Sequence, residues 1–316
     1  MSAYDDRRVA IIGAGLIGRS WSMVFAAAGW GVQIADPDSQ ALRAAPTLIA
    51  EGLERLAAHE LVTEPGAAAA RVRAVPDIAT ALDGVAFVQE CGPETLDAKH
   101  EIFALLDAKS PPDAIIASSS SGLYASQYTE TLRGRHRCLV GHPVNPPHLV
   151  PVVEVCATPW TAPEAVARTI QIYSAIGQVP VTIRTEIDGF VVNRLQGALL
   201  GEALRLVGDG VISPQDLDRT IKDGLGLRWS FMGPFETIDL NAPGGIGDYC
   251  LRYTALYRRL AEDPPPPSVW EEETIGRLLD AWGPPMGSDA RIERSAWRDR
   301  RLAALKAHKQ AVAADE

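Results

Sequence analysis

The sequence is poor in cysteine and contains no long apolar run. Its four cysteines, Cys91, Cys138, Cys156 and Cys250, are scattered over 316 residues without a CxxC pair. This spacing predicts neither a metal site nor a dense disulfide framework, and it favours a reducing compartment. No stretch of about 18 apolar residues occurs, so we expect no membrane-spanning helix. The polar start MSAYDDRR is unlike a signal peptide, and a soluble, cytoplasmic protein is therefore expected.

Basic residues are outnumbered by acidic ones. The chain has 30 Lys and Arg against 40 Asp and Glu, which gives a formal net charge of -10. Proteins that bind nucleic acids present clustered Lys and Arg to the phosphates, so we expect no nucleic-acid partner. A small anionic substrate stays compatible with this balance, because a single pocket can be locally positive.

Short apolar segments alternate with helical patterns through the first 186 residues. Runs that predict strands lie at 8–13, 32–36, 85–91, 114–120, 138–142 and 149–155. Strands separated by helical stretches indicate βαβ units and a mostly parallel sheet. The strands are almost continuously apolar, which is typical of a sheet that is buried on both faces. We therefore expect an α/β, Rossmann-type domain over residues 1–186, with helices on both faces of the sheet.

The pattern after residue 186 is helical. Segments expected to form helices lie at 190–210, 213–224, 268–282 and 288–313, and no strand pattern follows. The second of these begins with Ser213 as the N-cap and Pro214 at the first helical position, and we expect it to end at Gly224. The sequence thus predicts an all-α domain over residues 187–316, whose apolar helices favour burial between two copies of the chain.

The segment GAGLIG at 13–18 has the GxGxxG pattern of a dinucleotide-binding turn. It follows a predicted strand and opens a predicted helix, and Asp36 ends the next strand. Such glycines allow a tight turn, a close approach to the pyrophosphate and close packing of helix on strand. Asp36 would bind the ribose hydroxyls and repel a 2′-phosphate, which favours NAD over NADP; the alternative is a turn without a ligand. The expected NAD-binding residues here are Gly13, Gly15, Leu16, Ile17, Gly18 and Asp36.

Five segments in fixed order resemble the 3-hydroxyacyl-CoA dehydrogenase family over essentially the whole chain. They are GAGLIG, ASSSSGL (117–123), GHPVNPP (141–147), PVVEV (151–155) and DGFVVNRL (188–195). The chain is most similar to the lambda-crystallin and L-gulonate 3-dehydrogenase branch, through KDGLGLR (222–228), MGPFETI (232–238) and AWRDRRLAALK (296–306). The resemblance implies NAD-linked oxidation of a secondary alcohol at carbon 3 of an acid or acyl thioester. It also implies a homodimer in which the second domains pair and contribute to the substrate site.

The resemblance also implies which residues act. The catalytic histidine and its glutamate fall on His142 and Glu154, the substrate-oxygen ligands on Ser121 and Asn193, and the nicotinamide-side contacts on Glu94 and Lys99. The chemistry agrees, because removing a hydride from carbon requires that the hydroxyl proton leave too, and histidine titrates near neutral pH. A carboxylate on the second ring nitrogen would orient the imidazole and stabilise its cation. For each residue the alternative is a purely structural role in a core, a turn or a helix start.

Three features bear on the substrate. The stretch 48–65 has no lysine, whereas acyl-CoA members place serine and lysine contacts for CoA in that region, so a free hydroxy acid is favoured. Ser119 stands where fatty-acid members commonly have asparagine, which leaves open which hydroxyl of this loop binds the substrate. Arg228 is our candidate for a substrate carboxylate, since its planar fork suits bidentate binding. The alternative for Arg228 is a surface salt bridge.

The leading hypothesis is an NAD-dependent 3-hydroxy acid dehydrogenase with an L-gulonate-like sugar acid as substrate. Enzymatic alternatives act on 3-hydroxybutyryl-CoA or on L-carnitine, whose trimethylammonium group could contact Trp229 and Phe231. A different class of alternative is a crystallin-like structural protein or an NAD-sensing binding module without turnover.

Overall fold

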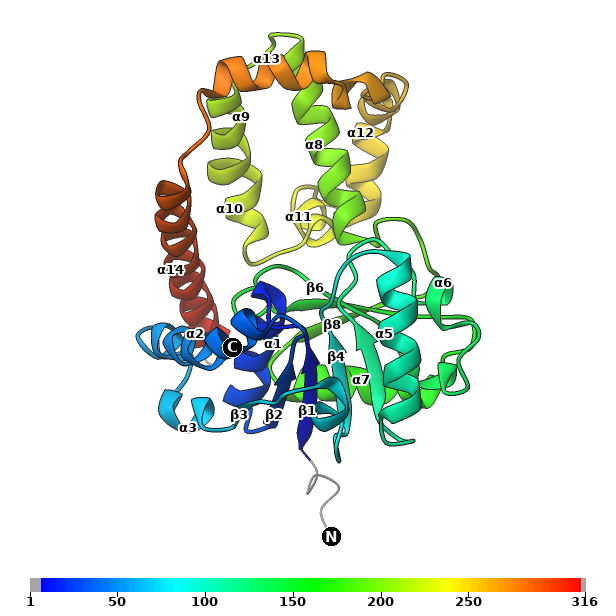
Figure 1. The fold of residues 1–316 in the computed structure, drawn as a ribbon. Coiled ribbons are helices and arrows are strands. Elements are labelled where there is room, and N and C mark those ends of the chain that lie inside the picture. Colours follow the sequence, from blue (N-terminus) through cyan, green and yellow to red (C-terminus); the bar gives the residue numbers. More distant parts are fainter. Residues whose placement is uncertain (1–6, 314–316) are drawn as a thin grey trace. The chain divides into compact units, whose positions relative to one another are not determined.

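The computed structural model describes residues 7–313, and the chain divides into two compact units (Figure 1). The first unit comprises Met1–Arg194 together with Ser295–Glu316, and the second comprises Leu195–Arg294. The first unit thus joins the expected α/β domain with the last part of the chain. The functional division at residues 186 and 187 stays a prediction. No helix in the described part of the chain is both long and apolar enough to cross a membrane.

An eight-stranded sheet forms the centre of the first unit, with the strand order β3-β2-β1-β4-β5-β6-β7-β8. The strands are β1 (Arg8–Ile12), β2 (Gly31–Ala35), β3 (Val72–Ala74), β4 (Phe87–Glu90), β5 (Ile115–Ser118), β6 (Cys138–Pro143), β7 (Val152–Ala157) and β8 (Val179–Ile183). All neighbouring strands are parallel except β6 and β7, which are antiparallel. The mostly parallel, Rossmann-type sheet is therefore confirmed.

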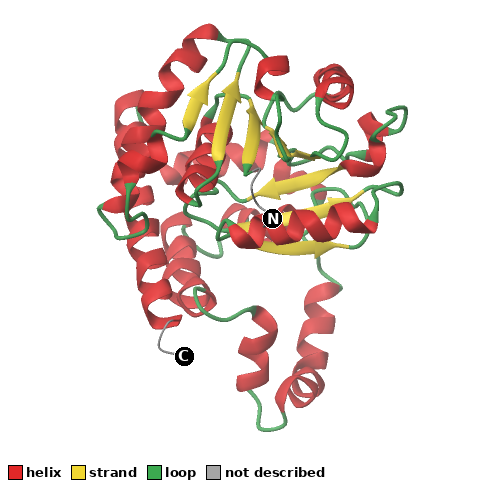
Figure 2. Cartoon of the chain, turned by 90° about the horizontal axis from the view of Figure 1, so that it is seen from below, coloured by secondary structure: helices red, strands yellow, loops and turns green. Residues whose placement is uncertain are grey.

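Helices cover both faces of this sheet (Figure 2). One face packs against α1 (Leu16–Ala27), α2 (Ser39–Ala57), α3 (Pro65–Ala69) and α7 (Pro163–Ala175), and the other against α4 (Ile78–Ala81), α5 (Leu96–Lys109) and α6 (Ser126–Thr129). Successive side chains of a strand point to opposite faces. Within β1, Val9 and Ile11 accordingly join the first core, whereas Ala10 and Ile12 join the second. This double burial explains the nearly continuous apolar strands.

Two edge strands were not among the expected ones. β3 has only three residues, and β8 carries Pro180 in its sequence VPVTI. Proline cannot donate a ladder hydrogen bond and is tolerated at the edge of a sheet. β8 is such an edge strand, since it pairs only with β7 among the described residues. Because its short apolar run contains a proline, β8 was not predicted as a strand.

The second unit is helical and has no strand between residues 195 and 294. Its helices are the body of α8 (Val192–Gly208), then α9 (Pro214–Arg219), α10 (Gly226–Trp229), α11 (Pro234–Leu240), α12 (Gly245–Ala261), a 3-10 turn (Pro267–Trp270) and α13 (Glu272–Trp282). The last helix, α14 (Ser288–Ala313), begins in this unit and ends in the first. The expected all-α region is confirmed.

The expected helix end at Gly224 is wrong. Six residues of π-helix, Thr220–Leu225, follow α9 and lead directly into α10. A π-helical turn is wider than an α-helical one, and such segments are inserted into longer helices. A Cβ atom on Gly226 would lie 2.9 Å from the carbonyl oxygen of Ile221, so glycine at this position allows the widened turn.

Candidate functional site

The glycine turn between β1 and α1 is built for close backbone contacts. Gly13 has a φ of 114°, and a Cβ atom there would lie 2.6 Å from the carbonyl oxygen of Cys91. A Cβ atom on Gly18 would lie 1.8 Å from the carbonyl oxygen of Gly13, so helix and turn touch at this point. A Cβ atom on Gly15, in contrast, would have no protein atom within 4 Å. The turn needs glycine at 13 and 18 for its own packing, and the space at 15 is open.

The start of α1 suits a diphosphate group. Gly15 is its N-cap, no side chain caps the helix, and its first turn contains no acidic residue. The unpaired N–H groups and the positive end of the helix dipole therefore attract an anion. Leu16 in this first turn is 70% exposed. These features fit a bound dinucleotide and give Leu16 an apolar surface to cover.

Asp36 follows β2 and holds the glycine turn. Its Oδ2 accepts a hydrogen bond from the amide of Ala14 at 2.6 Å, and its Oδ1 accepts one from the amide of Asp38 at 2.7 Å. A carboxylate oxygen can accept more than one hydrogen bond, so both oxygens can still accept from ribose hydroxyls. Asp36 is thus oriented in advance of any ligand.

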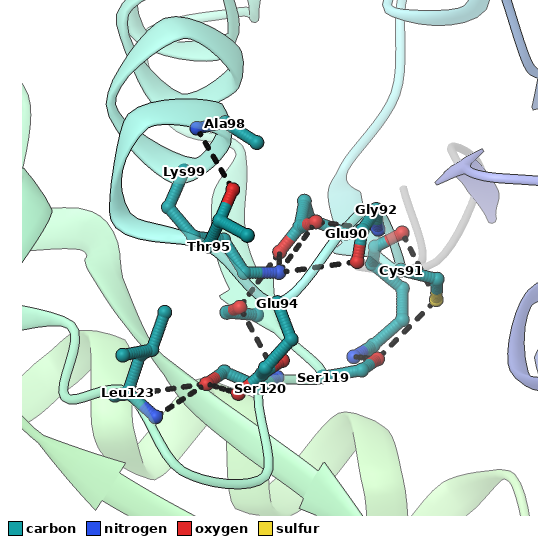
Figure 3. Close-up of polar contacts among 12 residues, drawn as sticks. Glu90, Cys91, Gly92, Glu94, Thr95, Ala98, Lys99, Ser119, Ser120 and Leu123 are labelled. Carbon is teal, nitrogen blue, oxygen red and sulfur yellow. Dashed lines mark hydrogen bonds and ion pairs between the residues drawn. The ribbon is translucent and has the colours of Figure 1, made fainter.

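A buried ion pair lies at the carboxyl end of β4 (Figure 3). Lys99 is 1% exposed, and its Nζ donates to both carboxylate oxygens of Glu90 at 2.8 Å. The hydroxyl of Ser118 donates to Glu90 Oε2 at 2.7 Å, and the amide of Gly92 donates to Oε1 at 2.6 Å. Lys99 therefore fixes the loop after β4 through Glu90, and its expected contact with the cofactor stays a prediction.

Glu94 fastens the loop that follows β5 (Figure 3). Its Oε1 accepts hydrogen bonds from the Ser120 hydroxyl at 2.6 Å and from the amides of Ser121 and Gly122 at 2.9 Å. Burial alone would raise the pKa of Glu94, but these hydrogen bonds and the charge of Lys99 outweigh it, so the pKa lies below its usual value. The charged carboxylate holds the backbone of Ser121 in place.

His142 and Glu154 form a buried pair across two antiparallel strands. They lie directly opposite each other in the register of β6 and β7, so their side chains share one face. His142 Nδ1 lies 2.8 Å from Glu154 Oε2, and the two residues are 6% and 0% exposed. Because a carboxylate can only accept, Nδ1 carries the proton of this hydrogen bond. The Nε2 atom has no hydrogen-bond partner among residues 7–313, so its lone pair is free.

The second oxygen of Glu154 is bound by the backbone at the start of α8. Its Oε1 accepts hydrogen bonds from the amides of Val191 and Val192, each at 2.9 Å. Burial alone would raise the pKa of Glu154, but the hydrogen bonds from His142, Val192 and Val191 outweigh it and place the pKa below its usual value. Glu154 is therefore held as a carboxylate with both oxygens directed.

Ser121 and Asn193 are also brought together. The side-chain Nδ2 of Asn193 donates to the carbonyl oxygen of Ser121 at 2.8 Å, which joins the loop after β5 to the start of α8. The Ser121 hydroxyl has no hydrogen-bond partner among residues 7–313. Since Asn193 directly follows Val192, a continuous path of bonds runs from His142 through Glu154 to Ser121 and Glu94. The imidazole of His142, the hydroxyl of Ser121 and the side chain of Asn193 thus belong to one connected network.

Arg228 belongs to the second unit. It forms no salt bridge among the described residues, and its Nε atom is buried without a hydrogen-bond partner. An unpaired buried donor is costly, and it is relieved by a ligand that accepts the hydrogen bond. The alternative of a surface salt bridge therefore finds no partner in the described part of the chain.

His148 lies in the loop between His142 and Glu154 and is structural. Its Nδ1 lies 3.1 Å from the hydroxyl of Ser20, and its carbonyl oxygen accepts a hydrogen bond from Lys306 on α14 at 2.9 Å. Burial lowers the pKa of His148 from 6.5 to about 4. The folded protein therefore holds this imidazole neutral at a pH where the unfolded chain already binds a proton.

This burial predicts a pH-dependent stability. The folded state disfavours the proton on His148, so the stabilisation is complete above pH 6.5 and is lost as the pH falls toward about 4. The loss amounts to about 3.5 kcal/mol at most, from about 2.5 pKa units at about 1.4 kcal/mol each. Urea unfolding across this range should show a smaller pH dependence for His148→Gln than for the wild type. Equal pH dependence in the two proteins would contradict the assignment.

Glu90 and Phe190 contribute to the site but were not among the residues predicted from the sequence. Glu90 is an acid at the carboxyl end of a strand whose four residues are all buried, and such a residue is buried only with a partner. Phe190 is fully buried, and its ring centroid lies 5.5 Å from that of His142. Nothing in the sequence around Asp188 and Gly189 predicts the contact of Phe190 with the imidazole.

Two family descriptions match this chain. The description "3-hydroxyacyl-CoA dehydrogenase, NAD binding domain" matches residues 8–187, and "3-hydroxyacyl-CoA dehydrogenase, C-terminal domain" matches residues 189–277. A lambda-crystallin homolog from Bos taurus is 42% identical over 306 residues, which covers 94% of this chain and 95% of the relative. An L-carnitine dehydrogenase from Pseudomonas sp is 36% identical over 297 residues, which covers 94% of this chain and 92% of the relative.

Solved structures share the same fold. The crystal structure of 5-formyl-3-hydroxy-2-methylpyridine 4-carboxylic acid 5-dehydrogenase, an NAD+ dependent dismutase, superimposes with a TM-score of 0.83 at 29% identity. The superposition covers 95% of this chain and 97% of the other. The likeness extends over both units of the chain.

Proposed function

The chain belongs to the 3-hydroxyacyl-CoA dehydrogenase family and carries that family's NAD-binding domain, and from this premise we propose a specific reaction. The protein oxidises the 3-hydroxyl group of a free hydroxy acid, with an L-gulonate-like sugar acid as the first candidate. The observation that carries the proposal is the buried pair of His142 and Glu154, joined from Nδ1 to Oε2 at 2.8 Å, with Nε2 free.

The proposed roles follow from this geometry. His142 accepts the proton of the substrate hydroxyl at Nε2 as the hydride leaves carbon 3. Glu154 stabilises the resulting imidazolium through Nδ1, and its carboxylate is kept charged by the two amides at the start of α8. The free hydroxyl of Ser121 and the remaining polar atoms of Asn193 hydrogen-bond the oxygen while it changes from alcohol to carbonyl. Bound NAD supplies the acceptor for the hydride.

The cofactor site fits NAD rather than NADP. Asp36 presents a carboxylate to the ribose, and its neighbours Pro37 and Asp38 offer no cation to a 2′-phosphate. The Glu94 carboxylate has one oxygen, Oε2, that makes no hydrogen bond among the described residues and is free for the nicotinamide side of the cofactor. Lys99 supports the same loop through Glu90. Gly13, Gly15, Leu16, Ile17 and Gly18 form the diphosphate turn.

A free acid is favoured over a CoA ester. The only Lys or Arg in residues 48–65 is Arg55, and it already pairs with Glu51 at 3.8 Å. The phosphates of CoA would need several cations there, and this stretch offers one arginine and no lysine. A free acid instead needs one cation for its carboxylate, and Arg228 forms no salt bridge among the described residues and has an unsatisfied Nε.

Replacing Arg228 by methionine tests this carboxylate role. We expect KM for the free acid to rise by about 10- to 100-fold, because a charge-assisted hydrogen bond contributes about 1.5–3 kcal/mol. KM for the neutral methyl ester of the same acid should change by less than about twofold. Steady-state kinetics with both substrates measures the difference.

Arg219→Met is the matched control, since Arg219 lies in the same unit and pairs with Asp216 at 2.6 Å on the surface. This variant should leave KM for both substrates unchanged. An equal rise in KM for acid and ester in the Arg228 variant would contradict the carboxylate role.

L-carnitine is the second candidate substrate. It also has a 3-hydroxyl group and a free carboxylate, and one relative of 36% identity is an L-carnitine dehydrogenase. Trp229 and Phe231, which follow Arg228 closely, are 40% and 68% exposed and offer aromatic faces to a trimethylammonium group. Arg228 would serve either acid.

A substrate panel decides between these candidates. NADH formation is measured with L-gulonate, L-carnitine, 3-hydroxybutyrate and 3-hydroxybutyryl-CoA under the same conditions. The proposal expects the highest kcat/KM with one of the free acids. Preference for the CoA ester would contradict the substrate class, and silence on all four with tight NAD binding would favour a structural or NAD-sensing protein.

The protein is proposed to act as a homodimer through its helical unit. Large apolar side chains in this unit are strongly exposed, among them Leu227, Phe231, Phe235, Leu240 and Leu251. Large exposed apolar side chains in such number are typical of interaction sites, and most oligomers are symmetric dimers of one chain. Light scattering, which measures the molar mass in solution, checks the assembly.

A further inference from the structure

Phe190 has a backbone conformation that residues other than glycine rarely adopt. Its φ is 47°, and the preceding Gly189 has a φ of 72°, so two successive residues are left-handed. For residues with a Cβ atom this conformation costs about 1–2 kcal/mol, and it is uncommon for a bulky residue. Such strain persists only where the surroundings over-determine it, and it is concentrated at functional sites. The contacts of Phe190 show what holds it there.

The ring of Phe190 covers the imidazole of His142. Phe190 is 0% exposed, and the two ring centroids lie 5.5 Å apart at an interplanar angle of 36°. The ring also meets Tyr124 edge-on at 6.5 Å, and the hydroxyl of Tyr124 donates a hydrogen bond to Asp188. The ring thus packs on the imidazole and on a tyrosine that is hydrogen-bonded to Asp188 of the same turn.

The backbone that follows Phe190 binds Glu154. The amides of Val191 and Val192 both donate to Glu154 Oε1 at 2.9 Å. The left-handed turn at Gly189 and Phe190 reverses the chain directly before these amides, and the amide of Phe190 closes the turn on the carbonyl of Ile187 at 2.9 Å. One residue therefore touches the histidine with its ring and directs the glutamate through the two amides next to it.

We propose that Phe190 is a positioning residue for the pair formed by His142 and Glu154. Its buried ring fixes the plane of the imidazole, and the same ring anchors the turn whose amides orient the carboxylate. This inference rests on the proposed dehydrogenase reaction. It adds a residue that acts on the reaction only through His142 and Glu154.

Two leucine variants separate positioning from core packing. Phe190→Leu keeps apolar volume in the same place but removes the flat ring. Phe103→Leu is the matched control, since Phe103 is also 0% exposed, lies in the same core cluster and packs on Tyr128 at 4.7 Å, away from His142. Both variants should lose a similar amount of thermal stability.

The kinetics should differ between them. We expect Phe190→Leu to lower kcat about 10-fold and Phe190→Ala about 100-fold, the scale at which small misplacements of catalytic groups reduce rates. KM and the Kd for NAD should stay within about twofold, and Phe103→Leu should keep the wild-type kcat. A wild-type kcat in the Phe190 variants, measured well below their Tm, would overturn the proposal.

Proton NMR tests the positioning role of Phe190 independently of turnover. The Nδ1 proton of His142, hydrogen-bonded to Glu154, should give a downfield proton NMR resonance in the wild type and in Phe103→Leu. Phe190→Ala should lose this resonance through exchange with water. Retention of the resonance in Phe190→Ala would overturn the proposal even if no substrate were turned over, whereas inactivity of the wild type on the substrate panel would refute the proposed function alone.

Discussion

Replacing His142 by glutamine is expected to lower kcat by about 1,000- to 10,000-fold, the contribution of a positioned acid–base group. Glutamine keeps a polar group at the position but cannot take up the proton of the substrate hydroxyl. The Kd for NAD should stay within about twofold of the wild type, because the expected NAD contacts lie in the glycine turn, at Asp36 and at Glu94 and Lys99, and not at His142. Stopped-flow or steady-state NADH formation, together with a fluorescence titration of NAD, measures the two effects separately.

His148→Gln is the matched control for this prediction. His148 lies in the same loop, but its Nδ1 faces the hydroxyl of Ser20 and not an acid. Its replacement should reduce stability and leave kcat within about threefold of the wild type. If His148 proved indispensable and His142 dispensable, the assignment of the acid–base pair would be wrong.

The second large effect is expected at the glycine turn. Gly15→Ala should raise the Kd for NAD by about 100-fold, because a methyl group there would stand where the backbone approaches the pyrophosphate. The Tm of the protein alone should change by less than about 2 °C, since a Cβ atom on Gly15 meets no protein atom within 4 Å.

Gly18→Ala should have a different signature. Its Cβ atom would lie 1.8 Å from the carbonyl oxygen of Gly13, so the helix and the turn would have to separate. We expect a marked fall in Tm, since overpacking against backbone costs about 1–3 kcal/mol or more, together with weaker NAD binding. A loss of stability in Gly15→Ala equal to that in Gly18→Ala would contradict the assignment of the open space to the cofactor.

The sequence predicts the sheet and the helical unit because both follow from periodic burial. The apolar runs at 8–13 and 85–91 have the composition of strands covered on both faces, and they became β1 and β4. The spacing of His142 and Glu154 was also informative, since the loop between them returns the chain as the antiparallel neighbour β7. Their direct pairing in the register is a consequence of that reversal.

Other features depend on contacts that no local pattern encodes. Strand β8 was not predicted, because it contains Pro180 and a proline is tolerated only where a strand lies at an edge. The edge position is a property of the whole sheet and cannot be seen in the local sequence. The bonds of Lys99 to Glu90 and of Glu94 to the loop at 120–122 arise where two neighbouring strands end side by side. The left-handed turn at Phe190 likewise depends on contacts of its ring with His142 and Tyr124, which lie far away in the sequence.

The most direct test of the account follows the hydrogen atom itself. The best substrate of the four-compound panel is prepared with deuterium at carbon 3 and oxidised in the presence of NAD. We expect one deuterium in each molecule of reduced cofactor, detected by mass spectrometry, and none at carbon 3 of the product. Reduced cofactor that carries only unlabelled hydrogen would contradict oxidation at carbon 3.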